Sequence, residues 1–254
     1  DSMYTDLIES NTDLKVDQKF NLNGGSFCFD ALNNDSIDMF VEYTGTALSD
    51  MLHEPIENDP DTVYNKVKDL MMERHNIHVS EPLGFNNTYV MSVKPELAEK
   101  YNLKTLSDLM KVSDQLKLGC TVEFVQREDC LPLLEKTFNS KFKSVSGLDA
   151  AIRYEAIDSG EVDVVDAFST DALLPKLGLV PLEDDVKFFP PYYAVNFVSQ
   201  EVLDKHPELE PVLAKMDGLF DEETMATLNG KVDIEGMDAK DVAHDFLLEK
   251  GLLK

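Results

Sequence analysis

The sequence predicts an α/β protein of two similar lobes, each a mostly parallel β-sheet flanked by helices. Helical and strand patterns alternate along all 254 residues. Residues 31–48 align without gaps on residues 156–173, and segments 86–93 and 190–197 also resemble each other. An alternating pattern with an internal repeat is typical of an α/β protein built from two related halves.

Apolar residues recur at helical spacing in five stretches. A helix is expected over 61–74, after the start signal Asp59-Pro60. Further helices are expected over 95–111, 147–157, 199–216 and 238–248. Short apolar runs between them, at 38–41, 89–93 and 162–165, predict strands.

The repeat predicts one equivalent aromatic position in each lobe. In both copies a helix ends at a polar turn, a short strand follows, and an aromatic residue comes just past the strand, Tyr43 in one copy and Phe168 in the other. Ligands of open α/β sheets bind outside the carboxyl ends of strands. We therefore expect both rings to face a shared crevice.

The second pair of similar segments predicts where the chain crosses between lobes. In each segment a tyrosine, Tyr89 or Tyr192, leads into an apolar extended run. The expected lobes are residues 1–88 with 192–254, and residues 89–191. Two crossings form a double-crossing hinge, which suits closure around a ligand.

Composition excludes several classes of protein. The chain has 23 basic and 49 acidic side chains, a formal charge of −26, which argues against a nucleic-acid partner. No apolar run reaches the roughly 18 to 20 residues of a membrane span. Cys28, Cys120 and Cys130 are too widely spaced for a metal site, so neither a metal nor a cofactor is expected.

Aromatic residues gather at the expected crevice: Tyr43, Tyr89, Phe168, and Tyr192 with its neighbour Tyr193. Ring faces attract cations, and several rings can enclose a quaternary ammonium group. The same residues would serve equally as core, and from the pattern alone core packing is favoured.

Four segments carry a resemblance to a known family. They are Glu42-Tyr43-Thr44-Gly45-Thr46, Gly84-Phe85-Asn86-Asn87-Thr88-Tyr89, Asp166-Ala167-Phe168-Ser169-Thr170-Asp171 and Phe188-Phe189-Pro190-Pro191-Tyr192. In order and spacing they resemble signature segments of the glycine betaine, carnitine and choline binding proteins of ABC importers. The resemblance implies the periplasmic-binding-protein fold of the second type, a binding protein rather than an enzyme, and four aromatics around a trimethylammonium group.

Carried over by position, the resemblance puts this box on Tyr43, Tyr89, Phe168 and Tyr192, with Tyr193 beside it. Thr46 and Arg127 match positions that hold the carboxylate of a betaine, and Asn87 matches a polar residue of the same pocket. A guanidinium suits a carboxylate. Arg127 follows a strand-like run over 121–125, and without the resemblance a surface ion pair with Glu123, Glu128 or Asp129 would be favoured.

The resemblance also implies partners and location. The ligand would be glycine betaine, carnitine, choline or proline betaine, and the protein partners would be the permease subunits of an ABC transporter. A monomer is expected, in the periplasm or tethered to the outer face of the cell membrane as a lipoprotein or a permease fusion. Relatives usually begin with a strand and a polar loop that nothing in residues 1–6 matches, so we expect an open sheet edge in the first lobe.

Two other functions stay open. An enzyme would use Asp166, Asp171 or Glu42 as acid or base, or Ser169 as nucleophile. No histidine lies in the crevice segments, however, and Ser169 lacks a Gly-x-Ser-x-Gly turn. An effector-binding module for an amino acid would need an acidic pair for the α-ammonium group, and the repeat supplies aromatics there instead.

Overall fold

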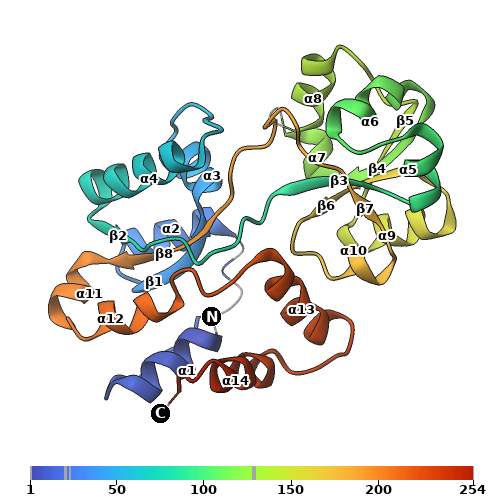
Figure 1. Ribbon diagram of the computed structural model, residues 1–254. Coiled ribbons are helices and arrows are strands. Elements are labelled where there is room, and N and C mark those ends of the chain that lie inside the picture. The colour runs from blue at the N-terminus through green and yellow to red at the C-terminus, as the bar shows by residue number, and fades with distance from the viewer. Residues whose placement is uncertain (1, 20–21, 23, 128–129, 254) are drawn as a thin grey trace. The chain divides into compact units, whose positions relative to one another are not determined.

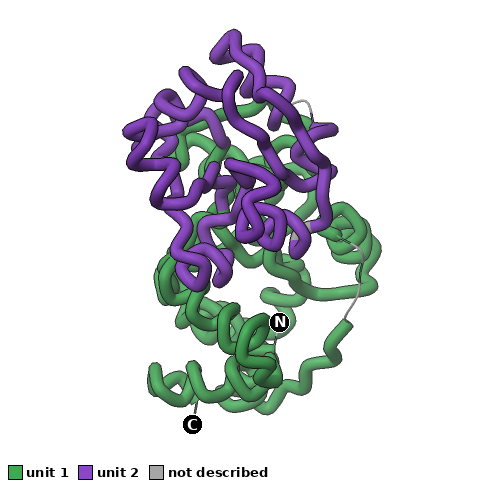
Figure 2. Tube along the Cα trace, turned by 90° about the vertical axis from the view of Figure 1, so that its right-hand side faces the viewer, with its two compact units in different colours: residues 1–87, 190–254 green, residues 88–189 purple. Residues whose placement is uncertain are grey.

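The computed structural model in Figure 1 describes all residues except 1, 20–21, 23, 128–129 and 254. The chain divides into two compact units, coloured in Figure 2. Unit 1 holds residues 1–87 and 190–254, and unit 2 holds residues 88–189. The chain therefore passes from one unit to the other twice.

Unit 1 contains a three-stranded sheet and the helices from both ends of the chain, α1–α4 and α11–α14 (Figure 1). Its elements are α1 (Ser2–Asn11), α2 (Gly25–Asn33), β1 (Met39–Tyr43), α3 (Thr44–Thr46), the π-helix η1 (Ala47–Met51), α4 (Pro60–His75), β2 (Ile77–Val79), β8 (Ala194–Ser199), α11 (Gln200–Lys205), α12 (Leu209–Leu213), the 3₁₀ helix η3 (Ala214–Met216), α13 (Glu222–Asp233) and α14 (Ala239–Glu249). The strand order is β1-β8-β2, and both neighbours run antiparallel to β8.

Unit 2 contains a five-stranded sheet of order β5-β4-β6-β3-β7. Its elements are β3 (Tyr89–Val93), α5 (Pro95–Tyr101), α6 (Leu106–Val112), the 3₁₀ helix η2 (Ser113–Gln115), β4 (Lys117–Thr121), α7 (Val122–Gln126), α8 (Leu131–Phe138), β5 (Ser144–Leu148), α9 (Ala150–Ser159), β6 (Val164–Phe168), α10 (Leu173–Lys176) and β7 (Val180–Pro181). Strand β4 is parallel to β5 and β6, whereas β3 is antiparallel to β6 and β7.

The α/β class is confirmed, but the prediction of mostly parallel sheets is wrong. The antiparallel pairs involve β3 and β8, and each of these strands enters its sheet straight from the other unit. A parallel neighbour needs a crossover connection, usually a helix. Neither strand has such a connection immediately before it, so β3 and β8 run against their neighbours.

The strands expected from the repeat are confirmed at matching positions. Strand β1 covers residues 39–43 and β6 covers residues 164–168, and the repeat aligns these two ranges residue for residue. Tyr43 and Phe168 are the last residues of their strands, not residues beyond them.

Two of the expected helices are broken. The helix expected over 95–111 stops at Tyr101, because Asn102 adopts a left-handed conformation (φ 51°), and a new helix starts where the Thr105 side chain accepts a hydrogen bond from the Asp108 N–H. The helix expected over 199–216 stops at Lys205, two residues before Pro207. The residue before a proline is disfavoured in a helix.

Strand β8 separates two apolar clusters of unit 1. Val195 and Phe197 pack in the cluster with Val63, Val67 and Met71 of α4. Ala194 and Val198 belong to the other cluster, with residues of α1, α12 and α14. Successive side chains of β8 point to opposite faces of the sheet, so this central strand is buried on both faces.

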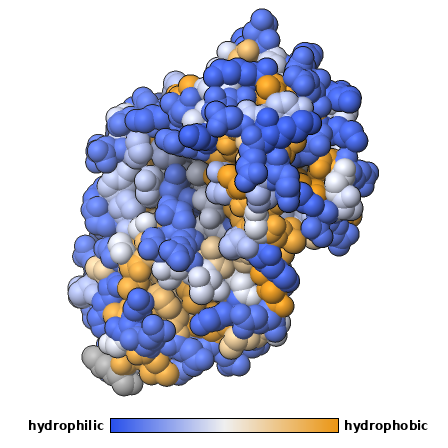
Figure 3. Space-filling view, turned by 45° about the vertical axis from the view of Figure 1, so that its right-hand side comes forward, coloured by the Kyte–Doolittle hydropathy of each residue, from blue (hydrophilic) through white to orange (hydrophobic). Residues whose placement is uncertain are grey.

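Most of the face drawn in Figure 3 is hydrophilic, as the excess of acidic residues predicts. Among the helices that the structure describes, none is both long enough and apolar enough to cross a membrane.

Candidate functional site

In unit 1, three of the predicted ligand residues form one chain of contacts. Tyr43 ends β1, and its ring meets that of Phe85 edge-on, with centroids 6.5 Å apart. Burial raises the pKa of Tyr43, and a hydrogen bond with the Asn87 side chain acts in the opposite direction. The Asn87 backbone N–H donates to the Tyr192 carbonyl at 3.0 Å. Tyr43, Asn87 and Tyr192 are therefore brought together.

A glycine lets the short helix α3 approach Tyr192 closely. A Cβ atom on Gly45 would lie 2.7 Å from the Pro191 carbonyl oxygen and 3.0 Å from two ring carbons of Tyr192. The Tyr192 backbone N–H donates to Asn86 Oδ1 at 2.7 Å. Tyr192 is buried, and these contacts fix both its ring and its backbone.

The other two predicted residues of unit 1 lie on the same segments. Thr44 Oγ1 donates to the Pro191 carbonyl and accepts from the Tyr193 N–H, each at 3.1 Å, which ties the start of α3 to residues 191–193. Tyr193 and Thr46, the last residue of α3, are both half-buried. Thr46 and Tyr193 thus flank the contacts between α3 and Tyr192.

In unit 2, the predicted residues Tyr89 and Phe168 are cross-strand partners on β3 and β6. Their ring centroids are 4.8 Å apart. Phe124 and Phe189 complete this cluster, with centroids 5.2 Å and 5.6 Å from that of Tyr89. We call these four rings the unit 2 aromatic cluster.

The sequence did not single out Phe124 or Phe189. Phe189 lies within one of the four resemblance segments, which is the signal that could have found it. Phe124 was missed because the sequence predicts a strand over 121–125, and this prediction is wrong. Thr121 ends β4, and its side chain then accepts from the Phe124 N–H to start α7.

Arg127 follows the last residue of α7. Its Nη1 lies 3.1 Å from Glu123 Oε1, one helical turn back. This is one of the three surface partners considered from the sequence. The other two, Glu128 and Asp129, lie outside the described residues. The assignment of Arg127 to a ligand carboxylate stays a prediction.

Arg153, which the sequence did not single out, is the centre of a buried ionic network in unit 2. The residue is 1% exposed. Its Nη1 lies 3.3 Å from Asp166 Oδ1, and its Nη2 lies 2.9 Å from Asp171 Oδ2. Arg153 falls on the buried face of α9 with Ala156 and Ile157, and a charge on an apolar face is the signal that could have drawn attention to it.

The network also contacts the end of β6. The Arg153 guanidinium carbon is 5.5 Å from the Phe168 ring centroid. Asp171 Oδ2 accepts from the Phe168 N–H at 3.1 Å and from the Tyr154 hydroxyl. Asp166 and Asp171, the acid or base candidates of the enzyme hypothesis, are thus held by Arg153 in ion pairs.

Glu42, the third acid of that hypothesis, is a buried carboxylate of unit 1. It is 5% exposed, and Oε1 accepts from the Tyr43 N–H at 2.7 Å. Burial raises its pKa to about 7, this hydrogen bond opposes the rise, and the Asp50 charge adds to it. Its other oxygen faces Gly25, where a Cβ atom would be only 2.0 Å away.

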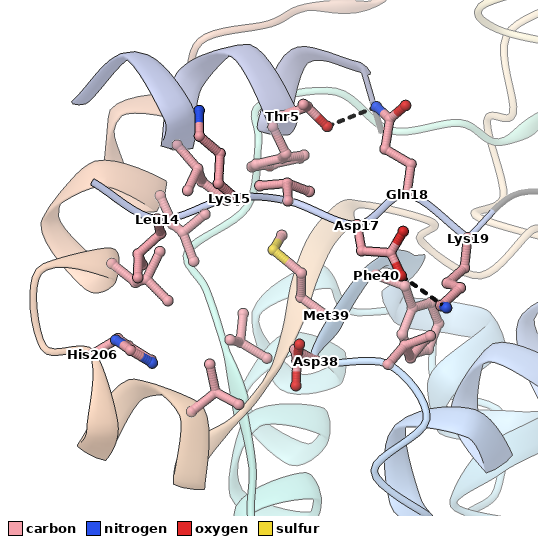
Figure 4. Close-up of a pocket in the computed structure, with 18 of the residues that line it drawn as sticks. Thr5, Leu14, Lys15, Asp17, Gln18, Lys19, Asp38, Met39, Phe40 and His206 are labelled. Atoms are coloured by element: carbon pink, nitrogen blue, oxygen red, sulfur yellow. Dashed lines mark hydrogen bonds and ion pairs between the residues drawn. The ribbon is translucent and has the colours of Figure 1, made fainter. Parts of the chain in front are cut away.

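A cavity of about 620 Å³ lies beside β1 in unit 1, and none of the eight predicted ligand residues lines it (Figure 4). Its lining comes from α1, residues 14–19, residues 36–41 and the region of α11 and α12, and includes Leu14, Val16 and Met39. Among the described residues, β1 pairs with β8 and with no other strand.

Comparison with known proteins identifies the family. A model of the OpuAC family, described as the substrate binding domain of ABC-type glycine betaine transport system, matches residues 1–249. The carnitine transport binding protein OpuCC of Listeria monocytogenes is 36% identical over 248 residues, which are 97% of this chain and 80% of that protein. The ergothioneine transport permease/ergothioneine binding protein EgtU of Helicobacter pylori is 34% identical over 247 residues, covering 97% of this chain. Those residues are 44% of EgtU, so the chain spans less than half of that relative.

Solved structures show the same relationship. A crystal structure described as a glycine betaine/carnitine/choline ABC transporter matches with a TM-score of 0.91 and 31% identity, covering 100% of this chain and 94% of that one. Apo YehZ from Escherichia coli matches with a TM-score of 0.80 and 28% identity, covering 99% of this chain and 93% of that one. The chain therefore belongs to the OpuAC family, the substrate binding domains of ABC-type glycine betaine transport systems, and is a transport binding protein rather than an enzyme.

Proposed function

We propose that the chain captures glycine betaine, carnitine, choline or proline betaine in an aromatic cage to which both units contribute, and delivers it to the permease of its importer. Tyr43 and Tyr192 would contribute from unit 1, and Tyr89 and Phe168 from unit 2. The observation that carries the proposal is that Tyr43 and Phe168, aligned by the repeat, end equivalent strands of different units. Closure of the hinge would bring the two sets of rings onto one ligand.

The chemistry of these positions suits a quaternary nitrogen. Such a nitrogen has no N–H to donate, so ring faces and methyl contacts replace hydrogen bonds. Asp166 and Asp171, the two acidic residues of the segment that holds Phe168, are engaged by Arg153 in ion pairs, which does not suit them to bind the α-ammonium group of an amino acid. We assign the rest of the ligand to Thr46, Asn87, Arg127 and Tyr193, with Arg127 reading a carboxylate.

The relatives support the ligand class and differ in the ligand. OpuCC is named for carnitine, YehZ for glycine betaine and EgtU for ergothioneine. Ergothioneine also carries a trimethylammonium group and a carboxylate, so it belongs in any ligand panel. The name of EgtU joins a permease with a binding protein, in keeping with a permease as the partner here.

Isothermal titration with the five quaternary amines, glycine and proline tests the proposal. We expect at least one of the quaternary amines to bind, and neither glycine nor proline to bind. Loss of one ring removes a cation–π contact of about 0.5 to 2 kcal/mol plus packing, which is roughly tenfold in affinity. Phe168→Tyr keeps the ring face and should bind like the wild type, whereas Phe168→Leu should show the loss. Full affinity in Phe168→Leu, or binding of the amino acids alone, would contradict the cage.

A further inference from the structure

We propose that the buried network of Arg153, Asp166 and Asp171 places one excess negative charge behind Phe168 and so makes the site prefer a cation over an uncharged ligand of the same shape. The inference rests on the proposed function, because it concerns the same ligand. It assigns a specificity role to residues that do not belong to the predicted cage.

The charge count follows from the contacts. One guanidinium meets two carboxylates, Asp166 through Nη1 and Asp171 through Nη2. The side chains of Arg153 and Asp166 are 2% and 0% exposed, and that of Asp171 is 28% exposed. Burial raises the pKa of Asp166, and the Arg153 charge and the hydrogen bonds from Thr121 oppose that rise. With both carboxylates ionised, one is in excess over the cation, and water and salt screen the buried Arg153 and Asp166 weakly.

Apart from Arg153, the hydrogen-bond donors described for these carboxylates are neutral groups. Asp166 accepts from the Thr121 N–H at 3.1 Å and from the Thr121 hydroxyl at 2.9 Å. Burial raises the pKa of the Tyr154 phenol, which donates to Asp171, so it keeps its proton. Burial and the Asp166 charge raise the pKa of the nearby Cys120 to about 12, so that thiol is neutral as well. The excess charge is not cancelled by these groups.

The network reaches the ring by two routes. The Arg153 guanidinium lies against the Phe168 ring, at 5.5 Å from its centroid, and the Phe168 N–H donates to Asp171. Asp166 and Phe168 are two residues apart on β6, so their side chains point to the same face of the sheet. A change of charge in the network therefore changes the electrostatic potential at the Phe168 ring.

The sign of the effect depends on the second carboxylate. A cation already lies against Phe168, and alone it would repel a ligand cation at the same ring. A single carboxylate would only neutralise Arg153. The second carboxylate reverses the sign, so the field at the ring favours a positive ligand.

The test compares quaternary ammonium ligands with their carbon isosteres in Asp171→Asn. Choline is paired with the neutral alcohol 3,3-dimethylbutan-1-ol, and zwitterionic glycine betaine with the anion 3,3-dimethylbutanoate; in each isostere carbon replaces the charged nitrogen. Dissociation constants are measured by titration, or by competition for the weaker isosteres. The affinity of each ammonium ligand relative to its isostere should fall about fivefold to tenfold, from one unit charge removed at roughly 10 Å from the nitrogen under partial screening. The alcohol should bind as it does to the wild type, and the butanoate should bind no more weakly.

Two matched variants separate charge from geometry. Tyr154→Phe removes a hydrogen bond to Asp171 but no charge, so it should leave the ratio between cation and isostere unchanged. Asp114→Asn removes one charge from the exposed surface of unit 2 and should do the same. If circular dichroism shows that Asp171→Asn is unfolded, Asp166→Asn removes the same charge, and the same result is expected.

Equal losses for cation and isostere in Asp171→Asn would show that the network only positions Phe168, and would overturn the inference. An unchanged ratio together with unchanged affinities would also overturn it, while leaving the cage intact. A wild type that binds no quaternary amine would instead refute the proposed function, and the inference with it.

Discussion

The buried carboxyl of Glu42 predicts that unit 1 loses stability as the pH rises. Its pKa is about 7 in the folded protein, against an ordinary value of 4.5. Below pH 4.5 the folded and unfolded chains both hold the proton, and the favourable contribution is fully present. Between pH 4.5 and 7 the unfolded chain releases the proton first, so stability falls as the pH rises through the folded pKa.

The size of the effect follows from the same two values. At about 1.36 kcal/mol per pKa unit, the difference between 4.5 and about 7 amounts to roughly 3 kcal/mol. Glu42→Gln keeps the shape of the side chain and cannot ionise. Relative to the wild type, this variant should therefore gain about 3 kcal/mol of unfolding free energy between pH 4 and pH 8.

Urea unfolding followed by circular dichroism at several pH values measures this difference, with two transitions fitted if the units unfold separately. Glu73→Gln, at an exposed position of α4, controls for the loss of one surface charge. A constant difference between wild type and Glu42→Gln from pH 4 to pH 8 would refute the reasoning.

Three further outcomes are expected. Arg127→Ala should weaken glycine betaine and carnitine far more than choline in titration, because choline has no carboxylate; equal losses would remove Arg127 from that role. Gly45→Ala should cost about 1 to 3 kcal/mol of stability and weaken ligand binding, since the new methyl group meets Tyr192 and Pro191 at 2.7 to 3.0 Å. Gly147→Ala, where the nearest atom would be 3.5 Å away, should do neither, and equal behaviour of the two variants would contradict the close packing. Small-angle scattering should show a smaller radius of gyration at saturating ligand, and an unchanged radius would count against closure of the hinge.

The fold class and the two repeat strands could be predicted from the sequence, because short apolar runs between helices are local signals. The family could be predicted because four signature segments occur in the expected order and spacing. Strand direction could not, because it depends on where the chain enters the sheet, as β3 and β8 show. Helix α7 was mistaken for a strand because Val122 to Val125 is as short and apolar as a buried strand.

The candidate site divides in the same way. Tyr43, Asn87 and Tyr192 lie close together in unit 1, and Tyr89 and Phe168 lie close together in unit 2, since they come from segments with strong local signals. The ion pairs of Arg153 join residues 13 and 18 positions apart, on α9, on β6 and beyond β6, and nothing in local periodicity links them. The roles of the eight predicted ligand residues stay predictions until binding is measured.

The strand order of unit 1 has a consequence for how the protein is made. Strands β1 and β2 each pair with β8, which lies at residues 194–199, after the whole of unit 2. During synthesis the ribosome must therefore produce nearly four fifths of the chain before this sheet can assemble. Unit 2, a continuous segment, has all of its strands earlier. Domains usually fold in order from the N-terminus. In this protein the synthesis of unit 2 is complete before that of unit 1, so the apolar residues of β1 and β2 stay without their central strand β8 until unit 2 has been made.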